Sequence, residues 1–181
     1  MKTESNVMYV LRLAAILLII TSLVAAALAG VNSITAPVIA QLTAEKTQLA
    51  IEAVLPGGGE EIEFVPADLV SKVYASDAGY AVQVTPGGFD NTITMMVGVD
   101  FEGKVLGIDI IKHTETAGLG AVADAETPAG QNFRGQFVDA SGSVAVTKDG
   151  GAMDSITGAT ITSRAICDGV NAALACAATL G

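Results

Sequence analysis

A dense cluster of hydroxyl side chains stands directly before the last helical segment of the chain. Two serines and three threonines fall within the nine positions 155–163. A helix needs only one of them as an N-cap, whose oxygen accepts a hydrogen bond from a first-turn N–H. The remaining hydroxyls therefore need another explanation, either in binding chemistry or in local packing.

Two interpretations of this cluster are open from the residues alone. In the first, Thr157, Thr160 or Thr162 is an ordinary N-cap. In the second, Gly158 and Ala159 remove side-chain bulk, so that a ligand can approach the backbone. Free N–H groups and the positive end of the helix dipole then favour an anion, and a phosphate whose oxygens bond to the hydroxyls is the natural guest.

A second polar segment, HTETAGLG, occupies residues 113–120 and follows an expected strand. Gly118 and Gly120 flank Leu119, which predicts a tight turn that exposes one apolar side chain. By residue type alone, Glu115 is a solvated carboxylate at a strand end and His113 a surface histidine. On its own, this segment does not indicate a function, and it becomes informative only together with the hydroxyl cluster.

The residues from Asp154 to Thr160 spell D-x-x-T-G-A-T, which closely resembles the flavinylation motif of the FMN-binding domain family. In that family, a separate flavin transferase uses FAD to attach FMN through a phosphoester to the last threonine of the motif. The resemblance implies that Thr160 is the acceptor here. It also implies that Thr157, Gly158 and Ala159 shape the approach and that Asp154 belongs to the transferase recognition element.

The HTETAGLG segment is similar to a signature of the same family that lies against the flavin ring. This likeness implies that Glu115 and Thr116 make polar contacts to the ring or the ribityl chain. Leu119 would pack on the ring face, and Gly118 would belong to the same cofactor-binding set. No catalytic residue and no metal ligand follow from the resemblance.

Within that family, the chain resembles the G subunits of the Rnf ion-translocating electron-transport complexes. The length of 181 residues, one N-terminal apolar segment and the sequence ITSRA after the motif all agree with them. The resemblance implies a flavoprotein subunit that relays electrons between ferredoxin and NAD beside other membrane and iron–sulfur subunits. Open alternatives are a subunit of a sodium-translocating NADH:quinone oxidoreductase, another extracytoplasmic carrier, and a non-redox anchored binding module.

The N-terminal part predicts a membrane helix at 13–31, which is 19 residues without a charge. Lys2 and Arg12 precede it and no basic residue follows until Lys46, so we expect residues 1–12 in the cytoplasm and the rest outside the cytoplasmic membrane. The alternative is a signal peptide cleaved after Ala29. We expect a helical stalk at 32–59 and a domain at 60–181. Pro56 and the three glycines that follow it end the stalk helix.

Composition excludes several classes of protein. Without Lys2, Glu4 and Arg12, the chain has seven basic and 18 acidic residues, too acidic for nucleic acid binding. The two cysteines, Cys167 and Cys176, lie about 13 Å apart on one helix and cannot form a disulfide with each other. With one histidine and no CxxC, the sequence offers no zinc, haem or iron–sulfur site.

The outer part predicts an α+β domain with an antiparallel sheet and packed helices. Alternating apolar residues at 71–112 form two hairpins, one turning at DAG and one at EG. The segment SVAVT at 143–147 predicts a further strand, and the segment 125–137 predicts one helical turn. From Thr162 on, apolar residues recur at helical spacing.

Overall fold

The computed structural model describes residues 2–181, with side chains described from Val7 onward. The chain divides into two compact units, 1–44 and 45–181, which are considered separately. The elements in chain order are α1 (Lys2–Val54), β1 (Glu60–Ile62), β2 (Val70–Ser76), β3 (Gly79–Val84), β4 (Thr94–Val99), β5 (Val105–Lys112), η1 (Gly120–Ala123), α2 (Pro128–Gly135), η2 (Thr147–Asp149) and α3 (Thr160–Leu180).

Helix α1 is long and apolar enough to cross a bilayer, and its large apolar side chains between Val7 and Leu42 are exposed. The hydroxyls of Thr21 and Ser33 donate to carbonyls four residues earlier, at 2.9 Å in both cases. Such internal bonding satisfies hydroxyl groups where no water is available. The unit is therefore suited to hydrocarbon surroundings, as the apolar segment at 13–31 predicts.

The second unit contains a five-stranded sheet in the order β1-β2-β3-β4-β5, and every neighbouring pair is antiparallel. This arrangement confirms the predicted meander and the α+β class. The first hairpin pairs Ser76 with Gly79. At the second, Asp100 accepts hydrogen bonds from the N–H groups of Glu102 and Lys104, at 2.9 and 2.8 Å. The loops predicted from turn residues therefore connect adjacent strands.

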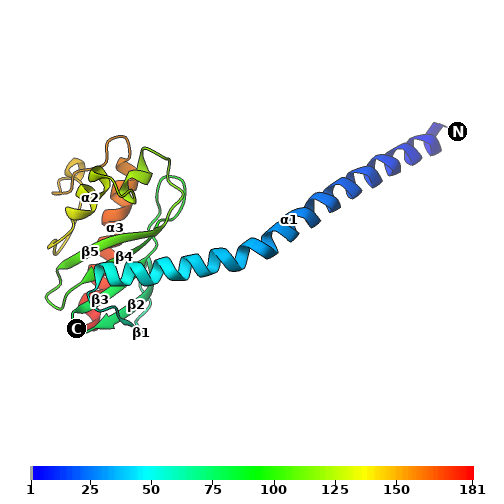
Figure 1. Cartoon of the computed structure of the whole chain (residues 1–181). Coiled ribbons are helices and arrows are strands. Elements are labelled where there is room, and N and C mark those ends of the chain that lie inside the picture. The colour runs from blue at the N-terminus through cyan, green and yellow to red at the C-terminus, as the bar shows by residue number, and fades with distance from the viewer. Residues whose placement is uncertain (1) are drawn as a thin grey trace. The chain divides into compact units, whose positions relative to one another are not determined.

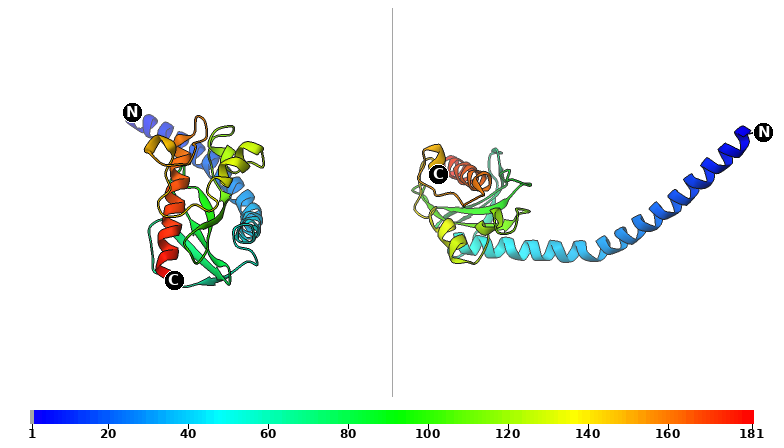
Figure 2. Two further views of the ribbon diagram at one scale, coloured as in Figure 1. Left: turned by 90° about the vertical axis from the view of Figure 1, so that its left-hand side faces the viewer. Right: turned by 90° about the horizontal axis from the view of Figure 1, so that it is seen from above.

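Helices cover both faces of the sheet (Figures 1 and 2). On one face, Ile166 and Val170 of α3 pack in the main core with Val82 and Val97. The other face is covered by the last turns of α1, in a second cluster formed by Ala50, Ile51, Val54, Leu55, Tyr74, Ala81, Met96 and Ile111. The start of α3 is thereby fixed at one end of a rigid layer.

Glycines make room for the end of α1. Gly98 and Gly107 pair across β4 and β5, and a methyl group on Gly98 would collide with the carbonyl of Val54. Residues 45–59, assigned from sequence to a stalk, thus lie in the compact unit of the sheet. The positive φ angles of Gly57 and Gly58 turn the chain from α1 toward β1.

Two local expectations need correction. The segment 143–147 is not a strand, although its apolar residues alternate. The side chain of Asn171 takes the place of a neighbouring strand, because it both donates to and accepts from the backbone of Val144 at 2.8 Å. The single helical turn expected within 125–137 is an eight-residue helix, α2, capped by Thr127.

Candidate functional site

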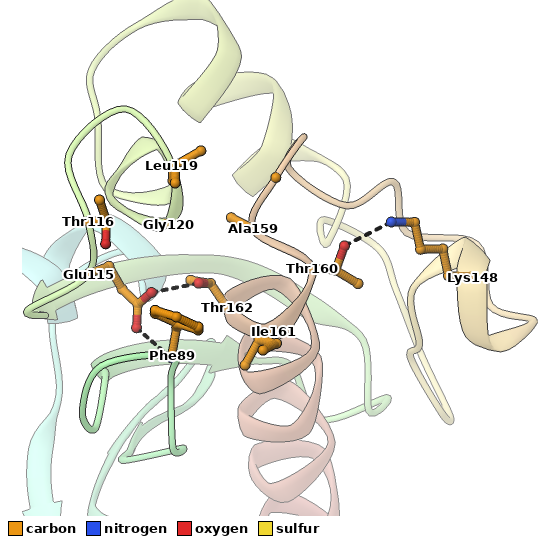
Figure 3. Close-up of a pocket in the computed structure, with 11 residues that line it drawn as sticks. Phe89, Glu115, Thr116, Leu119, Gly120, Lys148, Ala159, Thr160, Ile161 and Thr162 are labelled. Carbon is orange, nitrogen blue, oxygen red and sulfur yellow. Dashed lines mark hydrogen bonds between the residues drawn. The ribbon is translucent and has the colours of Figure 1, made fainter.

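A cavity of about 270 Å³ opens at the N-terminal end of α3 (Figure 3). The loop before η1, the start of α3, the β3–β4 connection and η2 all contribute to it. Its lining consists of Phe89, Glu115, Thr116, Leu119, Gly120, Lys148, Gly158, Ala159, Thr160, Ile161 and Thr162. The HTETAGLG segment and the hydroxyl cluster, the two segments that the sequence singles out for binding chemistry, therefore line the same cavity.

The start of α3 has no hydroxyl cap. Ala159 occupies the N-cap position and no side chain bonds to the first-turn N–H groups. The interpretation of Thr157, Thr160 or Thr162 as an N-cap is therefore wrong. Gly158 has φ +79°, and its α-carbon lies so close to Leu119 that a methyl group would meet the leucine side chain at 2.9 Å. The first-turn N–H groups of α3 are thus open to a hydrogen-bond acceptor from a ligand, and the Leu119 side chain lies beside them.

Two of the five hydroxyls serve the packing of this segment. Ser163 is fully buried, donates to the carbonyl of Ala159 and accepts from the N–H of Ile156, both at 3.0 Å. Thr162 is 2% exposed and donates to Glu115 Oε2 at 2.6 Å. These two side chains fix the motif against the domain and are not free for a ligand.

Glu115 is buried, where its residue type predicts a solvated charge. Its Oε1 accepts from the N–H of Phe89 at 2.8 Å and its Oε2 from Thr162. Gly88 and Gly120 give it space, since a methyl group on either would collide with the carboxylate. The carboxylate therefore joins three segments at the floor of the cavity, as the dashed lines in Figure 3 show.

Thr160 stands apart from the buried hydroxyls. It is half-buried at the cavity, and its Oγ1 accepts a hydrogen bond from Lys148 Nζ at 2.9 Å (Figure 3). Leu119, Phe89 and Ile161 add large, exposed apolar side chains to the same lining. The cavity thus combines a cation and a hydroxyl with an apolar rim.

The structure does not place every predicted residue in this cavity. Gly118, Asp154 and Thr157 line a neighbouring hollow of about 580 Å³. There, the side chain of Gln136 accepts from the N–H of Asp154 at 2.7 Å and donates to its carbonyl at 3.3 Å. This amide holds the motif backbone, and the Asp154 side chain itself is exposed.

Five lining residues lie outside the predicted cofactor-binding set, namely Phe89, Gly120, Lys148, Ile161 and Thr162. A signal for Lys148 existed, because it is the only basic residue between Arg134 and Arg164. Phe89 lies in a loop of glycines and polar residues, where an aromatic side chain stands out. Neither signal indicates which distant segment the side chain contacts.

Comparison with known proteins agrees with this geometry. Residues 88–175 match the FMN-binding domain family, and this range includes all residues that line the cavity. The domain is thus an FMN-binding domain.

Over most of its length, the chain is 32% identical to the G subunit of the Na⁺-translocating ferredoxin:NAD⁺ oxidoreductase complex of Acetobacterium woodii, with 94% of this chain and 92% of the relative covered. It is 31% identical to the G subunit of the ion-translocating oxidoreductase complex of Methanosarcina acetivorans, over 87% and 89%. The chain therefore belongs to the family of G subunits of ion-translocating oxidoreductase complexes, which confirms the resemblance drawn from its motifs.

The residue types in the lining suit both ends of an FMN molecule. An uncapped helix N-terminus and the ammonium of Lys148 suit a phosphate. Leu119, Phe89 and Ile161 suit a flat aromatic ring. Gly158 is exposed in the same lining and has no side chain that would obstruct a ligand.

Proposed function

We propose that this chain is the membrane-anchored, FMN-carrying subunit that relays electrons within an ion-translocating ferredoxin:NAD oxidoreductase. The observation that carries the proposal is the D-x-x-T-G-A-T motif at the cavity of an FMN-binding domain, in a chain similar over nearly its whole length to such subunits. The partners are the other membrane and iron–sulfur subunits of the complex. Bound FMN supplies transfer of one or two electrons, so the chain needs no acid, base or nucleophile for a substrate of its own.

The attachment residue is Thr160. Among the five hydroxyls of the motif region, Thr162 and Ser163 are buried and bonded, while Ser155 and Thr157 line the other hollow. Only the hydroxyl of Thr160 both faces the cavity and lies beside a cation. Its Oγ1 forms the new bond to phosphorus, the pyrophosphate bond of FAD breaks, AMP leaves, and the hydroxyl proton passes to a base of the flavin transferase.

Other residues of the chain hold and shield the cofactor. Leu119, Phe89 and Ile161 give the ring apolar contacts and keep water from one side of it. Glu115 fixes the loop that carries Leu119, since it is bonded to two other segments. Thr116 is exposed beside this loop and is available for polar contacts to the ribityl chain.

The membrane anchor and its orientation complete the proposal. Residues 13–31 of helix α1 form the span, and Lys2 and Arg12 on its N-terminal side favour an orientation with the domain outside the cytoplasm. Outside the cell membrane a dissociated cofactor would be diluted and lost. A covalent bond prevents that loss, which explains why a flavin transferase would modify this subunit.

The experiment is mass spectrometry of the chain purified from its native membrane, together with two variants. The native chain should carry the mass of one FMN on the peptide that contains Thr160. Thr160→Val should abolish flavin fluorescence of the denatured protein, whereas Thr92→Val, at an exposed threonine outside the cavity, should keep it. An unmodified native chain, despite an active transferase, would refute the proposal, and so would fluorescence that persists in Thr160→Val.

A further inference from the structure

Two consecutive residues of η2 contact α3 at positions one helical turn apart. Lys148 Nζ donates to Thr160 Oγ1 at 2.9 Å. Asp149 accepts two hydrogen bonds from Arg164, from Nε to Oδ2 at 2.6 Å and from Nη2 to Oδ1 at 2.7 Å. Because 160 and 164 lie on the same face of the helix, the second contact holds the turn that presents the first.

The ion pair between Asp149 and Arg164 restricts geometry more than it adds stability. The two side chains are 39% and 48% exposed, and exposed pairs contribute little to global stability. The contact is nevertheless bidentate, which restricts orientation as well as distance. The hydrogen bond from Arg164 holds the pKa of Asp149 below its usual value.

The lysine needs such a restraint. A free lysine side chain on an exposed turn samples many rotamers, and fixing it costs conformational entropy. The backbone of the turn is itself confined, because Gly151 packs so closely on the backbone of Ala145 that a methyl group there would collide. With the turn fixed on both sides, the backbone of Lys148 is held where its ammonium reaches Thr160, so the backbone of the turn need not be ordered when an anion binds there.

We propose that Asp149 and Arg164 act as a clasp that positions Lys148 as the fixed cation of the flavin attachment step. This inference rests on the proposed attachment at Thr160. The ammonium stabilises the negative charge that develops on Oγ1 as its proton leaves, and afterwards lies beside the anionic phosphodiester. Lys148 keeps its own proton throughout, and no group is oxidised or reduced. Asp149 and Arg164 are positioning residues, because they act only through the lysine.

Because the domain is strongly acidic, binding of an anionic nucleotide depends on a cation close to the binding site. The chain outside its N-terminal segment carries 18 acidic and seven basic residues, so it repels an anionic flavin nucleotide. Among the residues that line the cavity, Lys148 is the only cation. This one side chain therefore supplies the only side-chain cation that attracts phosphate to the acceptor oxygen, in addition to the open N-terminus of α3.

The test measures the initial rate of attachment to the full chain in detergent, with FAD and purified flavin transferase. Lys148→Met should slow attachment about tenfold, equivalent to about 1.4 kcal/mol in the barrier. Asp149→Asn should also slow it in the native background, but should have no further effect in a Lys148→Met chain, since it acts through the lysine. Equal slowing in both backgrounds, or none in the native one, would overturn the inference.

Two controls separate this role from a structural one. Glu61→Gln breaks an exposed ion pair with Lys72 on β1 and β2, 2.8 Å long, and should leave the rate unchanged. Exchange of the charges, Asp149→Arg with Arg164→Asp, should restore the rate lost in either single variant, and failure of this rescue would count against the clasp. If the native chain is modified at Thr160 and the clasp variants react equally fast, only the clasp fails. If the native chain is not modified, the proposed function fails.

Discussion

Replacement of Thr162 by valine isolates the contact that fixes the motif to the cavity floor. Valine has nearly the shape of threonine, so the substitution removes the hydroxyl without opening a large cavity. The lost bond is 2.6 Å long, ends on a carboxylate, and joins side chains of residues that are 2% and 8% exposed. A hydrogen bond to a charged group contributes about 1.5–3 kcal/mol. Because the Phe89 N–H still serves Glu115, we expect the unfolding free energy to fall by about 2 kcal/mol.

Thermal unfolding of the full chain in detergent, followed by circular dichroism, measures this loss. For a domain of this size, about 2 kcal/mol corresponds to a fall in Tm of about 8 °C. The matched control is Thr157→Val, in the same segment, where the side chain is exposed and the change should cost less than about 0.5 kcal/mol. Equal Tm values for the two variants would refute the assignment of Glu115 and Thr162 as a buried structural pair.

Two further predictions concern the core. Gly98→Ala should destabilise the domain by about 3 kcal/mol, because the new methyl group collides with the Val54 carbonyl, whereas Gly107→Ala, with its nearest atoms at 4.0 Å, should cost little; denaturant titration distinguishes them. Burial raises the pKa of the Cys167 thiol to about 11, so at pH 8 its thiolate is about 100-fold scarcer than that of a free cysteine, and iodoacetamide should label it only after unfolding, as peptide mass spectrometry would show.

The sheet was predictable because its information is local. Alternating apolar residues and short turns specify each hairpin without knowledge of distant segments. The same pattern misled at 143–147, because a side chain on α3, Asn171, supplies the hydrogen bonds that a neighbouring strand would otherwise supply. The contact between the end of α1 and the sheet was equally unpredictable from the sequence. Gly98 looks like a weak strand residue in the sequence, and only the approach of Val54 explains it.

In the candidate site too, the contiguous part was predictable from the sequence and the contacts between distant segments were not. The acceptor motif is a contiguous stretch, so its composition alone raised the possibility of a phosphate site. Lys148 is separated from Thr160 by 11 residues and, in sequence, cannot be told from a solvated lysine in a turn. Glu115 was expected to be solvated for a related reason. Its two partners, Phe89 and Thr162, come from segments far before and after it in the chain.

Helical geometry explains why so many hydroxyls coexist with a single acceptor. Successive residues of a helix point about 100° apart, so side chains at 160 and 162 differ by about 200° and face nearly opposite directions. Thr162 therefore turns inward to Glu115 when Thr160 faces Lys148. Ser163 holds the preceding loop in place. The buried hydroxyls thus fix the rotation of the helix start, and that rotation determines which oxygen can be modified.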